Sequence, residues 1–246
     1  GVTKNPKLGQ SYIKIAAKNQ YAEAIAYYFI SKVLSPIKQN KKDYFISLNK
    51  LIEKVNENIL NSIILMLLNN DYQLNISYIY IIYLLEFLAQ KGNSVAMNNY
   101  AYLLQNGIFV PEVNYQEAIK YYKMAIEKKN YDAFTNYAYM IEKGQGVEID
   151  YQKAIELYKI AINEGNNHKA MYYYAEMLLN GRGIEVNYQE AIKYFKMAIK
   201  YGNSKAMTSY ALMLQKGQGV ELDFKEARKY YEMAIKNDIN NTEAML

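Results

Sequence analysis

The sequence predicts an all-α protein built from stacked, antiparallel pairs of helices. Small residues recur in phase along the chain, at steps of 37, 37 and 36 residues. A fixed period of this length is typical of helical repeat proteins. Only three prolines and twelve glycines interrupt 246 residues that are 51% hydrophobic, which favours long helices over many short strands. The phased residues are Ala101, Ala138, Ala175 and Ala211, and likewise Gly107, Gly144, Gly181 and Gly217.

Each unit begins with an amphipathic segment that we call helix A. In residues 96–104, apolar side chains at spacings of three and four form one stripe. The glycine that follows, Gly107 in the first unit, stands where a helix ends in a left-handed residue. That conformation costs a residue with a Cβ about 1 kcal/mol or more. We therefore expect helix A to end at this glycine in every unit.

A short loop and a second helix, helix B, follow in each unit. In three units a second glycine, as in Gly144-Gln145-Gly146, should let the loop reverse its direction. Helix B then begins at residues that favour the N-cap position: Asn114, Asp150, Asn187 and Asp223.

Helix B carries small and large residues on one face. Ala118 and Ala125 lie seven residues apart on the face that carries Tyr122, an arrangement that lets neighbouring helices pack closely. Because the aromatic position recurs in register, we interpret it as part of the core rather than as a binding surface. Its members are Tyr122, Tyr158, Phe195 and Tyr231.

Residues 1–91 follow the period less closely, and we expect them to be diverged helical repeats continuous with the rest. Helices are predicted at about 9–18, 22–34, 43–56, 59–69 and 76–90. The most apolar runs, 63–68 and 76–89, are shorter than the roughly 18–20 residues that a membrane span needs. No membrane insertion is therefore predicted.

The repeated residues resemble the Sel-one-like repeat (SLR) family, a relative of the tetratricopeptide repeat. The pattern is Ala-x-x-x-Tyr-Ala-x-x-Leu-x-x-Gly-x-Gly-Val-x-x-Asp-Tyr-x-x-Ala-x-x-Tyr-Tyr-x-x-Ala-x-x-x-Gly-Asn. Residues 170–203 match it, with Ile184 and Asn187 as near equivalents. The resemblance covers residues 92–246 as four units and a truncated fifth. The units are 96–132, 133–169, 170–205 and 206–242. It implies a right-handed α-solenoid.

The first unit departs from the pattern, because Gly107 is followed by Ile108-Phe109-Val110-Pro111 and has no second glycine. At the other end, Ala244 and Met245 align with the start of an earlier helix A. A solenoid usually closes with a polar capping helix. The truncated fifth unit therefore predicts an uncapped end that could associate with another chain.

Catalytic and metal chemistry is not predicted. The chain has no cysteine, and its single histidine, His168, falls in an expected exposed turn between units. The Gly-x-Gly pairs lack the third glycine of a dinucleotide site and the Lys-Ser/Thr ending of a P-loop. Glu142, Glu148 and Asp150 do not have the spacing of a calcium loop. We expect no enzyme activity, no cofactor and no metal.

The distribution of charge argues against nucleic acid as a partner. Residues 1–91 carry 11 Lys and Arg against 6 Asp and Glu, whereas residues 92–246 carry 18 against 18, so the net charge of +5 arises outside the clear repeats. Phosphate neutralisation needs clustered cations. The expected partner is a protein or a peptide, and a cytoplasmic location is the working assumption.

The resemblance to tetratricopeptide folds implies that helices A line a concave surface, where the helix-A residues that the repeat core does not use contact a partner. These positions differ between units and are rich in amides and tyrosines, which suit an extended peptide or a partner helix. The middle turns lack Lys and Arg, which argues against a clamp for phosphate or a terminal carboxylate. The predicted binding residues are Asn98, Asn99, Tyr102, Gln105, Thr135, Asn136, Tyr139, Glu142, Tyr172, Tyr173, Glu176, Leu179, Thr208, Ser209, Leu212 and Gln215.

Two functions remain open at this point. The resemblance implies a non-catalytic scaffold or adaptor that binds a protein on its helix-A surface. The alternative is a regulatory subunit or domain of an enzyme whose catalytic part lies on another chain or beyond residue 246.

Overall fold

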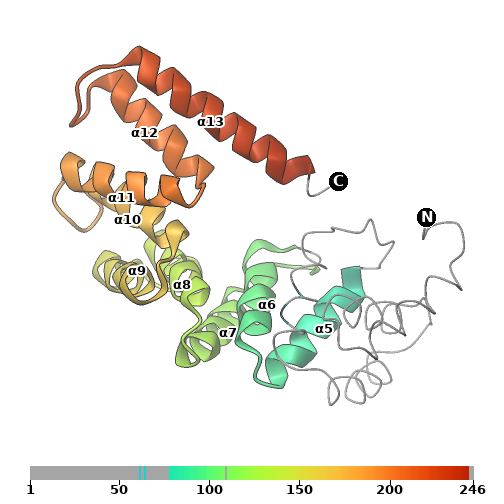
Figure 1. Ribbon diagram of the computed structural model, residues 1–246. Coiled ribbons are helices and arrows are strands. Elements are labelled where there is room, and N and C mark those ends of the chain that lie inside the picture. Colours follow the sequence, from blue (N-terminus) through green and yellow to red (C-terminus); the bar gives the residue numbers. More distant parts are fainter. Residues whose placement is uncertain (1–60, 62–63, 65–77, 109, 244–246) are drawn as a thin grey trace, which may run out of the picture. The chain divides into compact units, whose positions relative to one another are not determined.

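The computed structural model describes residues 61, 64, 78–108 and 110–243. These residues form helices and no strand, which confirms the all-α class (Figure 1). Two compact units meet in sequence between Asn114 and Tyr115. The helices are α5 (Tyr78–Gln90), α6 (Ser94–Asn106), α7 (Tyr115–Glu127), α8 (Tyr131–Lys143), α9 (Tyr151–Gly165), α10 (His168–Asn180), α11 (Tyr188–Lys200), α12 (Ser204–Lys216) and α13 (Phe224–Glu243).

In the first unit, α5 packs against α6. The predicted helix at 76–90 is confirmed as α5, whereas those at 9–18, 22–34 and 43–56 lie outside the described residues, as does most of 59–69. Helix α6 is the first helix A. Its N-cap, Asn93, accepts a hydrogen bond from the Ala96 amide and donates one to Oδ1 of Asn61 at 2.8 Å.

In the second unit, helix α7 is followed by the pairs α8–α9, α10–α11 and α12–α13. Within each pair the two helices pack closely, and each pair also contacts the next, α9 with α10 and α11 with α12. Helices α8, α10 and α12 are the predicted helices A, and α7, α9, α11 and α13 are helices B. Figure 1 shows these antiparallel pairs following one another along the chain.

The core of the second unit consists of the phased alanines and the aromatic residues between them. Ala138, Ala154 and Ala161 are fully buried, as are Tyr158 and Phe195. An alanine leaves room for the facing ring, so the helices approach closely and little empty space remains. The prediction that the recurring helix-B aromatics belong to the core is confirmed, although Tyr231 on the last helix is only partly buried.

Helix ends follow the sequence signals closely. Gly144, Gly181 and Gly217 adopt left-handed conformations with φ of 67°, 67° and 65° and end the three helices A. The side chains of Asp150, Asn187 and Asp223 accept hydrogen bonds from the backbone of Lys153, Glu190 and Glu226 at 2.9, 3.0 and 2.8 Å, so that they cap helices B as predicted.

Helices A have N-caps that the sequence analysis did not identify. Asn130, Asn167 and Asn203 accept hydrogen bonds from Ala133, Ala170 and Ala206. Two of these asparagines also reach back one repeat. Asn167 Nδ2 donates to Asp132 Oδ1 at 2.8 Å, and Asn203 Nδ2 donates to the His168 carbonyl at 3.3 Å. One amide therefore both starts a helix and joins it to its neighbour.

The second glycine of each loop has a role beyond turning the chain. Gly183 has φ of 67°, and a Cβ placed on it would lie 2.2 Å from the Cβ of Tyr151 in the preceding repeat. Only a glycine lets the loop approach this closely. The same contact recurs at Gly146 and Gly219, against Tyr115 and Tyr188.

A glutamine beside each of these tyrosines strengthens the same junction. The side-chain amides of Gln116, Gln152 and Gln189 donate to the carbonyl oxygens of Gly146, Gly183 and Gly219 at 2.8, 2.6 and 2.6 Å. We call these three contacts the glutamine rungs. They join the loop of each repeat to the start of helix B in the repeat before it.

At the C-terminal end, α13 continues without interruption from Phe224 to Glu243. Residues 236–243 contain no glycine, whereas Gly202 follows the end of the equivalent helix one repeat earlier. The predicted start of a truncated fifth unit, Ala244 and Met245, lies outside the described residues. No helix of the described chain combines the length and apolar character required to cross a membrane.

Candidate partner-binding surface

Three tyrosines of the second unit form a continuous aromatic surface on helices α8 and α10. Tyr139, Tyr172 and Tyr173 are each partly exposed. The ring centroids of Tyr139 and Tyr173 lie 5.0 Å apart, and those of Tyr172 and Tyr173 lie 5.1 Å apart. We call these three residues the tyrosine face.

The core holds the tyrosine face from behind. Tyr158 stacks on Tyr173 with a centroid separation of 5.7 Å, and Phe195 contacts Tyr172 at 6.2 Å. Both supporting rings are fully buried. The exposed rings are therefore held in place before any partner arrives, which limits the conformational entropy that binding would cost.

A buried carboxylate lies beside these rings. Glu142, in the last turn of α8, has a side chain that is 1% exposed. Its Oε2 accepts a hydrogen bond from the Tyr158 hydroxyl at 3.0 Å. Its Oε1 pairs with Lys143 Nζ at 2.8 Å and with Arg182 Nη1 at 2.7 Å. Two cations and a hydroxyl thus satisfy the charge, as a buried carboxylate requires.

Burial of Tyr158, followed by the negative charge of Glu142, raises the pKa of the Tyr158 hydroxyl well above its ordinary value. Burial, followed by Glu176, raises the pKa of Tyr172 as well. Both hydroxyls therefore stay neutral across the physiological range. They act as hydrogen-bonding groups rather than as acids.

Helix α12 adds polar groups to the same surface. The Ser209 hydroxyl donates to Oε1 of Glu176 on α10 at 2.7 Å, and Asn180 also donates to the Glu176 side chain at 3.4 Å. Leu212, on α12 as well, is 39% exposed. The helix-A side of the second unit therefore presents aromatic rings, hydroxyls and one aliphatic side chain.

Four of the predicted binding residues are not on the surface. Asn98, Gln105, Thr135 and Glu142 are buried. Thr135 donates its hydroxyl to the Tyr131 carbonyl of its own helix at 3.0 Å, and Glu142 is satisfied as described above. The expectation that these four contact a partner is therefore wrong. Their side chains serve packing and internal hydrogen bonding.

Variation between repeats also has a partly internal cause. Glu142 accepts from Tyr158, and Gln215, at the same position of its own unit, accepts from the Tyr231 hydroxyl at 3.2 Å. Where helix B carries Phe195 instead, the corresponding helix-A residue is Leu179, packed against the same apolar core. The helix-A residue is thus a hydrogen-bond acceptor where helix B carries a tyrosine hydroxyl, and it is apolar where helix B carries a phenylalanine. Packing against helix B therefore accounts for the variation at this one position.

The remaining predicted residues are accessible to different degrees. Tyr102, Thr208, Leu212 and Gln215 are exposed, whereas Asn99, Asn136, Tyr139, Tyr172, Tyr173, Glu176, Leu179 and Ser209 are partly buried. Tyr102 and Asn99 belong to the first unit. Thr208 donates its hydroxyl to the Ser204 carbonyl of its own helix at 3.1 Å. The structure brings together those on α8, α10 and α12.

Arg182 is a residue near this surface that the sequence analysis did not identify. It comes from the loop Gly181-Arg182-Gly183 and reaches Glu142 in the preceding repeat. Arg182 lies in a loop and not in the middle turns of a helix A, so the pattern of cations along helices A does not reveal it. A signal was present, since Arg182 replaces the glutamine found at Gln145 and Gln218.

His168 is not the exposed turn residue that was expected. It is the first residue of α10, partly buried, and its ring stacks against Tyr201 with a centroid separation of 6.3 Å. Burial, followed by the charge of Lys169, lowers the pKa of His168. Among the described residues, no cluster of three or more His, Cys, Asp or Glu is arranged to hold a metal ion.

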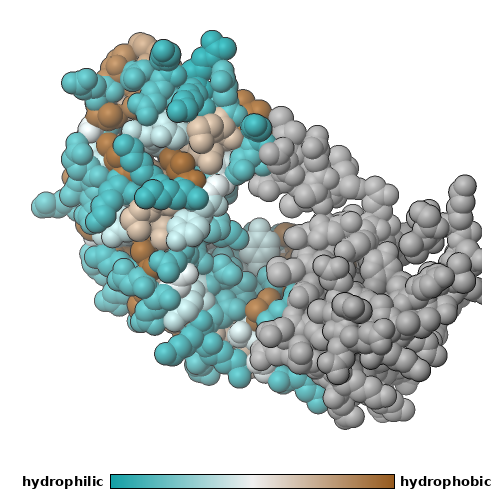
Figure 2. All heavy atoms as spheres, viewed as in Figure 1, coloured by the Kyte–Doolittle hydropathy of each residue, from teal (hydrophilic) through white to brown (hydrophobic). Residues whose placement is uncertain are grey.

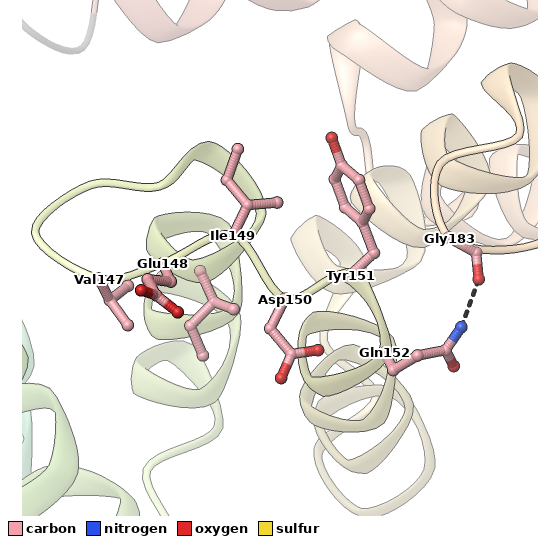
Figure 3. Close-up of a pocket in the computed structure, with 8 residues that line it drawn as sticks. Val147, Glu148, Ile149, Asp150, Tyr151, Gln152 and Gly183 are labelled. Carbon is pink, nitrogen blue, oxygen red and sulfur yellow. Dashed lines mark hydrogen bonds between the residues drawn. The ribbon is translucent and has the colours of Figure 1, made fainter.

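A pocket of about 540 Å³ lies on another part of the second unit, where the loop before α9 meets the following repeat (Figure 3). Ile141 and Val147 contribute apolar surface, and Glu148 and Asp150 contribute carboxylates. Gln152 and Gly183, which form a glutamine rung, close one side. The prediction that Asp150 caps a helix holds, although it also lines this pocket.

Comparison with known proteins agrees with this architecture. The model of the Sel1 repeat family matches residues 1–21, 94–130, 133–166, 168–203 and 204–238. A search of curated proteins finds no match. Among solved structures, the Sel1 repeat protein from Oxalobacter formigenes aligns with a TM-score of 0.68 and 22% identity, over 87% of this chain and 84% of that one.

Two further structures share the fold at lower identity. The protective antigen c5321 of uropathogenic Escherichia coli, which displays an SLR fold, gives a TM-score of 0.59 at 18% identity, over 95% of this chain and 49% of that one. The immunity protein Pa5087 from Pseudomonas aeruginosa gives 0.56 at 13% identity, over 89% and 83%. At such identities the likeness concerns the fold alone.

Proposed function

The chain belongs to the Sel1 repeat family, and we propose that it is a non-catalytic scaffold that binds a partner protein on its tyrosine face. Proteins of this family generally mediate protein–protein interactions. The observation that carries the proposal is the set of partly exposed rings of Tyr139, Tyr172 and Tyr173, packed against each other and against buried rings.

The chemistry of this surface favours an extended peptide or a helix that presents apolar side chains. Aromatic rings that are already fixed supply contact area at low entropic cost, and tyrosine is enriched among residues that dominate binding energy. Glu142 engages both Arg182 and Lys143, so these cations are not poised to bind a phosphate or a terminal carboxylate. Apolar contact with polar edges is therefore the expected mode of recognition.

Site-specific photo-crosslinking tests the location of the surface. A photoreactive residue placed at Leu212, which is 39% exposed on α12, the helix A that follows α10, should capture a discrete partner from cells. The same residue at Met233, which is 38% exposed on the last helix B, is the matched control. The proposal requires capture at 212 that disappears with Tyr139→Ala and Tyr172→Ala. Equal capture at 233, or capture that survives both substitutions, would reject it.

A further inference from the structure

The loops between helices A and B form a second continuous edge of the second unit. The glutamine rungs join successive loops through the helix starts that follow them. Gln152, just after the loop at 144–150, donates to Gly183 of the loop at 181–187, and Gln189, just after that loop, donates to Gly219 of the loop at 217–223. In Figure 1 the α10–α11 and α12–α13 loops lie at the same side of the helix stack. We call residues 148–150, 185–187 and 221–223 the loop edge.

Each loop of this edge carries an exposed aliphatic residue in the same place. Ile149, Val186 and Leu222 are 56%, 50% and 57% exposed. One side of each of these side chains packs against the first glycine of the same loop. A Cβ on Gly144, for example, would lie 2.9 Å from Ile149 Cγ1. The other side faces solvent. By contrast, the neighbouring Val147, Ile184 and Val220 pack against the core.

Acidic residues flank the aliphatic row. Over residues 145–153, 182–190 and 218–226 there are seven carboxylates against two lysines and Arg182, and Arg182 is paired with Glu142. In the first loop the Ile149 side chain points to the opposite side from the carboxylates of Glu148 and Asp150 (Figure 3). On the visible face of the described residues, hydrophobic patches are small and lie among hydrophilic atoms (Figure 2).

The geometry points to a docking surface for a basic amphipathic helix of a partner protein. Its apolar stripe would lie along Ile149, Val186 and Leu222, and its Lys or Arg side chains would meet the flanking carboxylates. The pocket of about 540 Å³ would take one long side chain, with Ile141 and Val147 against its stem and Glu148 and Asp150 near its charged end. The excess of carboxylates along the loop edge is the reason to expect a partner helix with Lys or Arg side chains.

The length of the occupant follows from the repeat spacing. Packed helices lie about 8–10 Å apart, so three successive loops span roughly 20 Å. An α-helix rises about 1.5 Å per residue, so about 14 residues cover that distance. The loop edge and the tyrosine face share no residue, so substitutions can test the two surfaces independently.

The test uses the full chain and three fluorescent peptides of about 14 residues. One carries a leucine stripe among lysines, one the same stripe among glutamates, and one lysines without a stripe. At physiological salt, the first should bind about tenfold or more tightly than either of the others, because both apolar contact and opposite charge are needed. Equal binding of the two lysine peptides would leave only non-specific attraction and would overturn the proposal.

Substitutions locate the site. The triple variant Ile149→Ser, Val186→Ser and Leu222→Ser should weaken binding of the leucine–lysine peptide about tenfold. A control triple variant at other exposed apolar residues, Tyr201→Ser, Met233→Ser and Ile235→Ser, should bind like the wild type. Circular dichroism must show equal helicity. If the loop variant unfolds, two milder variants replace it: the single substitution Leu222→Ser, and the double substitution Glu148→Gln with Glu185→Gln. Each should weaken binding of the leucine–lysine peptide severalfold.

One further variant separates this site from the tyrosine face. Tyr139→Ala with Tyr172→Ala should leave binding of the leucine–lysine peptide unchanged. Loss of peptide binding in that variant, with none in the loop variant, would place the peptide on the tyrosine face and contradict the loop edge. Partner crosslinking at Leu212 would be unaffected by that result, so the two proposals can fail separately.

Discussion

At the scale of single residues, hydrogen bonding in the interior explains the identity of several side chains that the sequence predicted to be ligand contacts. Glu142 is buried because Tyr158, Lys143 and Arg182 satisfy its two oxygens. A hydroxyl on helix B needs an acceptor on the facing helix A, and a phenylalanine needs an apolar neighbour. Sequence comparison of the repeats showed the variation, but only the packed structure shows its cause.

This pairing can be tested with a double-mutant cycle at Phe195 and Leu179. Phe195→Tyr places a hydroxyl in the core beside an apolar residue, and we expect it to lower the free energy of unfolding by about 1–3 kcal/mol. Adding Leu179→Gln supplies the acceptor used at Gln215, so the double variant should be more stable than the sum of the two single effects by about 1 kcal/mol.

Urea denaturation of the four proteins measures this coupling energy. Additive losses, with no favourable coupling between positions 179 and 195, would show that the helix-A residue does not respond to the hydroxyl that it faces.

Tyr158 gives the chain a pH dependence on the alkaline side. Its pKa is raised in the folded state, so its contribution to stability is fully present below the unfolded pKa of about 10 and is lost as pH rises toward the folded value. In that interval each such tyrosine lowers the free energy of unfolding by about 1.4 kcal/mol per pH unit.

Urea midpoints measured from neutral pH to about pH 11 test this effect. Tyr158→Phe should be less stable at neutral pH but should lose stability less steeply above about pH 10. Tyr201→Phe, at an exposed position, should keep the slope of the wild type. Equal slopes in all three proteins would contradict the assignment to Tyr158.

At the scale of helices and loops, the sequence predicted what local chemistry decides. Left-handed glycines ended helices A, and Asp150, Asn187 and Asp223 capped helices B. The N-caps of helices A were missed, although Asn93, Asn130, Asn167 and Asn203 recur with the same steps as the alanines. Burial of Thr135 and the reach of Arg182 to Glu142 could not be predicted, because both depend on how repeats stack.

Gly183, the second glycine of one loop, and Gly217, the first glycine of the next, should differ in their tolerance of a methyl group. In Gly183→Ala the new Cβ would lie 2.2 Å from Tyr151 Cβ and at φ of 67°. We expect a loss of about 2–4 kcal/mol in the free energy of unfolding, from strain and overpacking together. Gly217→Ala has φ of 65° and its nearest atom at 3.7 Å, so only the backbone strain of about 1–2 kcal/mol applies.

Thermal or urea unfolding of the two glycine variants gives the comparison. The account requires the larger loss at Gly183. A larger loss at Gly217 would show that the close approach of loop and tyrosine does not hold the repeats together.

At the scale of the whole molecule, stability and binding both follow from contacts between neighbouring repeats. In a solenoid each repeat touches only its neighbours, so its stability is roughly a sum over repeats and junctions. The glutamine rungs and the amides of Asn167 and Asn203 are the polar part of those junctions. The rings of Tyr139, Tyr172 and Tyr173 nevertheless stay partly exposed.

The most direct test of the central claim is the affinity of the captured partner for two variants, measured by isothermal titration calorimetry. Tyr139→Ala with Tyr172→Ala should weaken binding about tenfold or more, since loss of central aromatic contacts costs about 1–2 kcal/mol or more. Tyr201→Ala removes an exposed ring elsewhere and should bind as the wild type does. Unchanged affinity in the first variant, with its helices intact, would contradict the assignment of the binding surface.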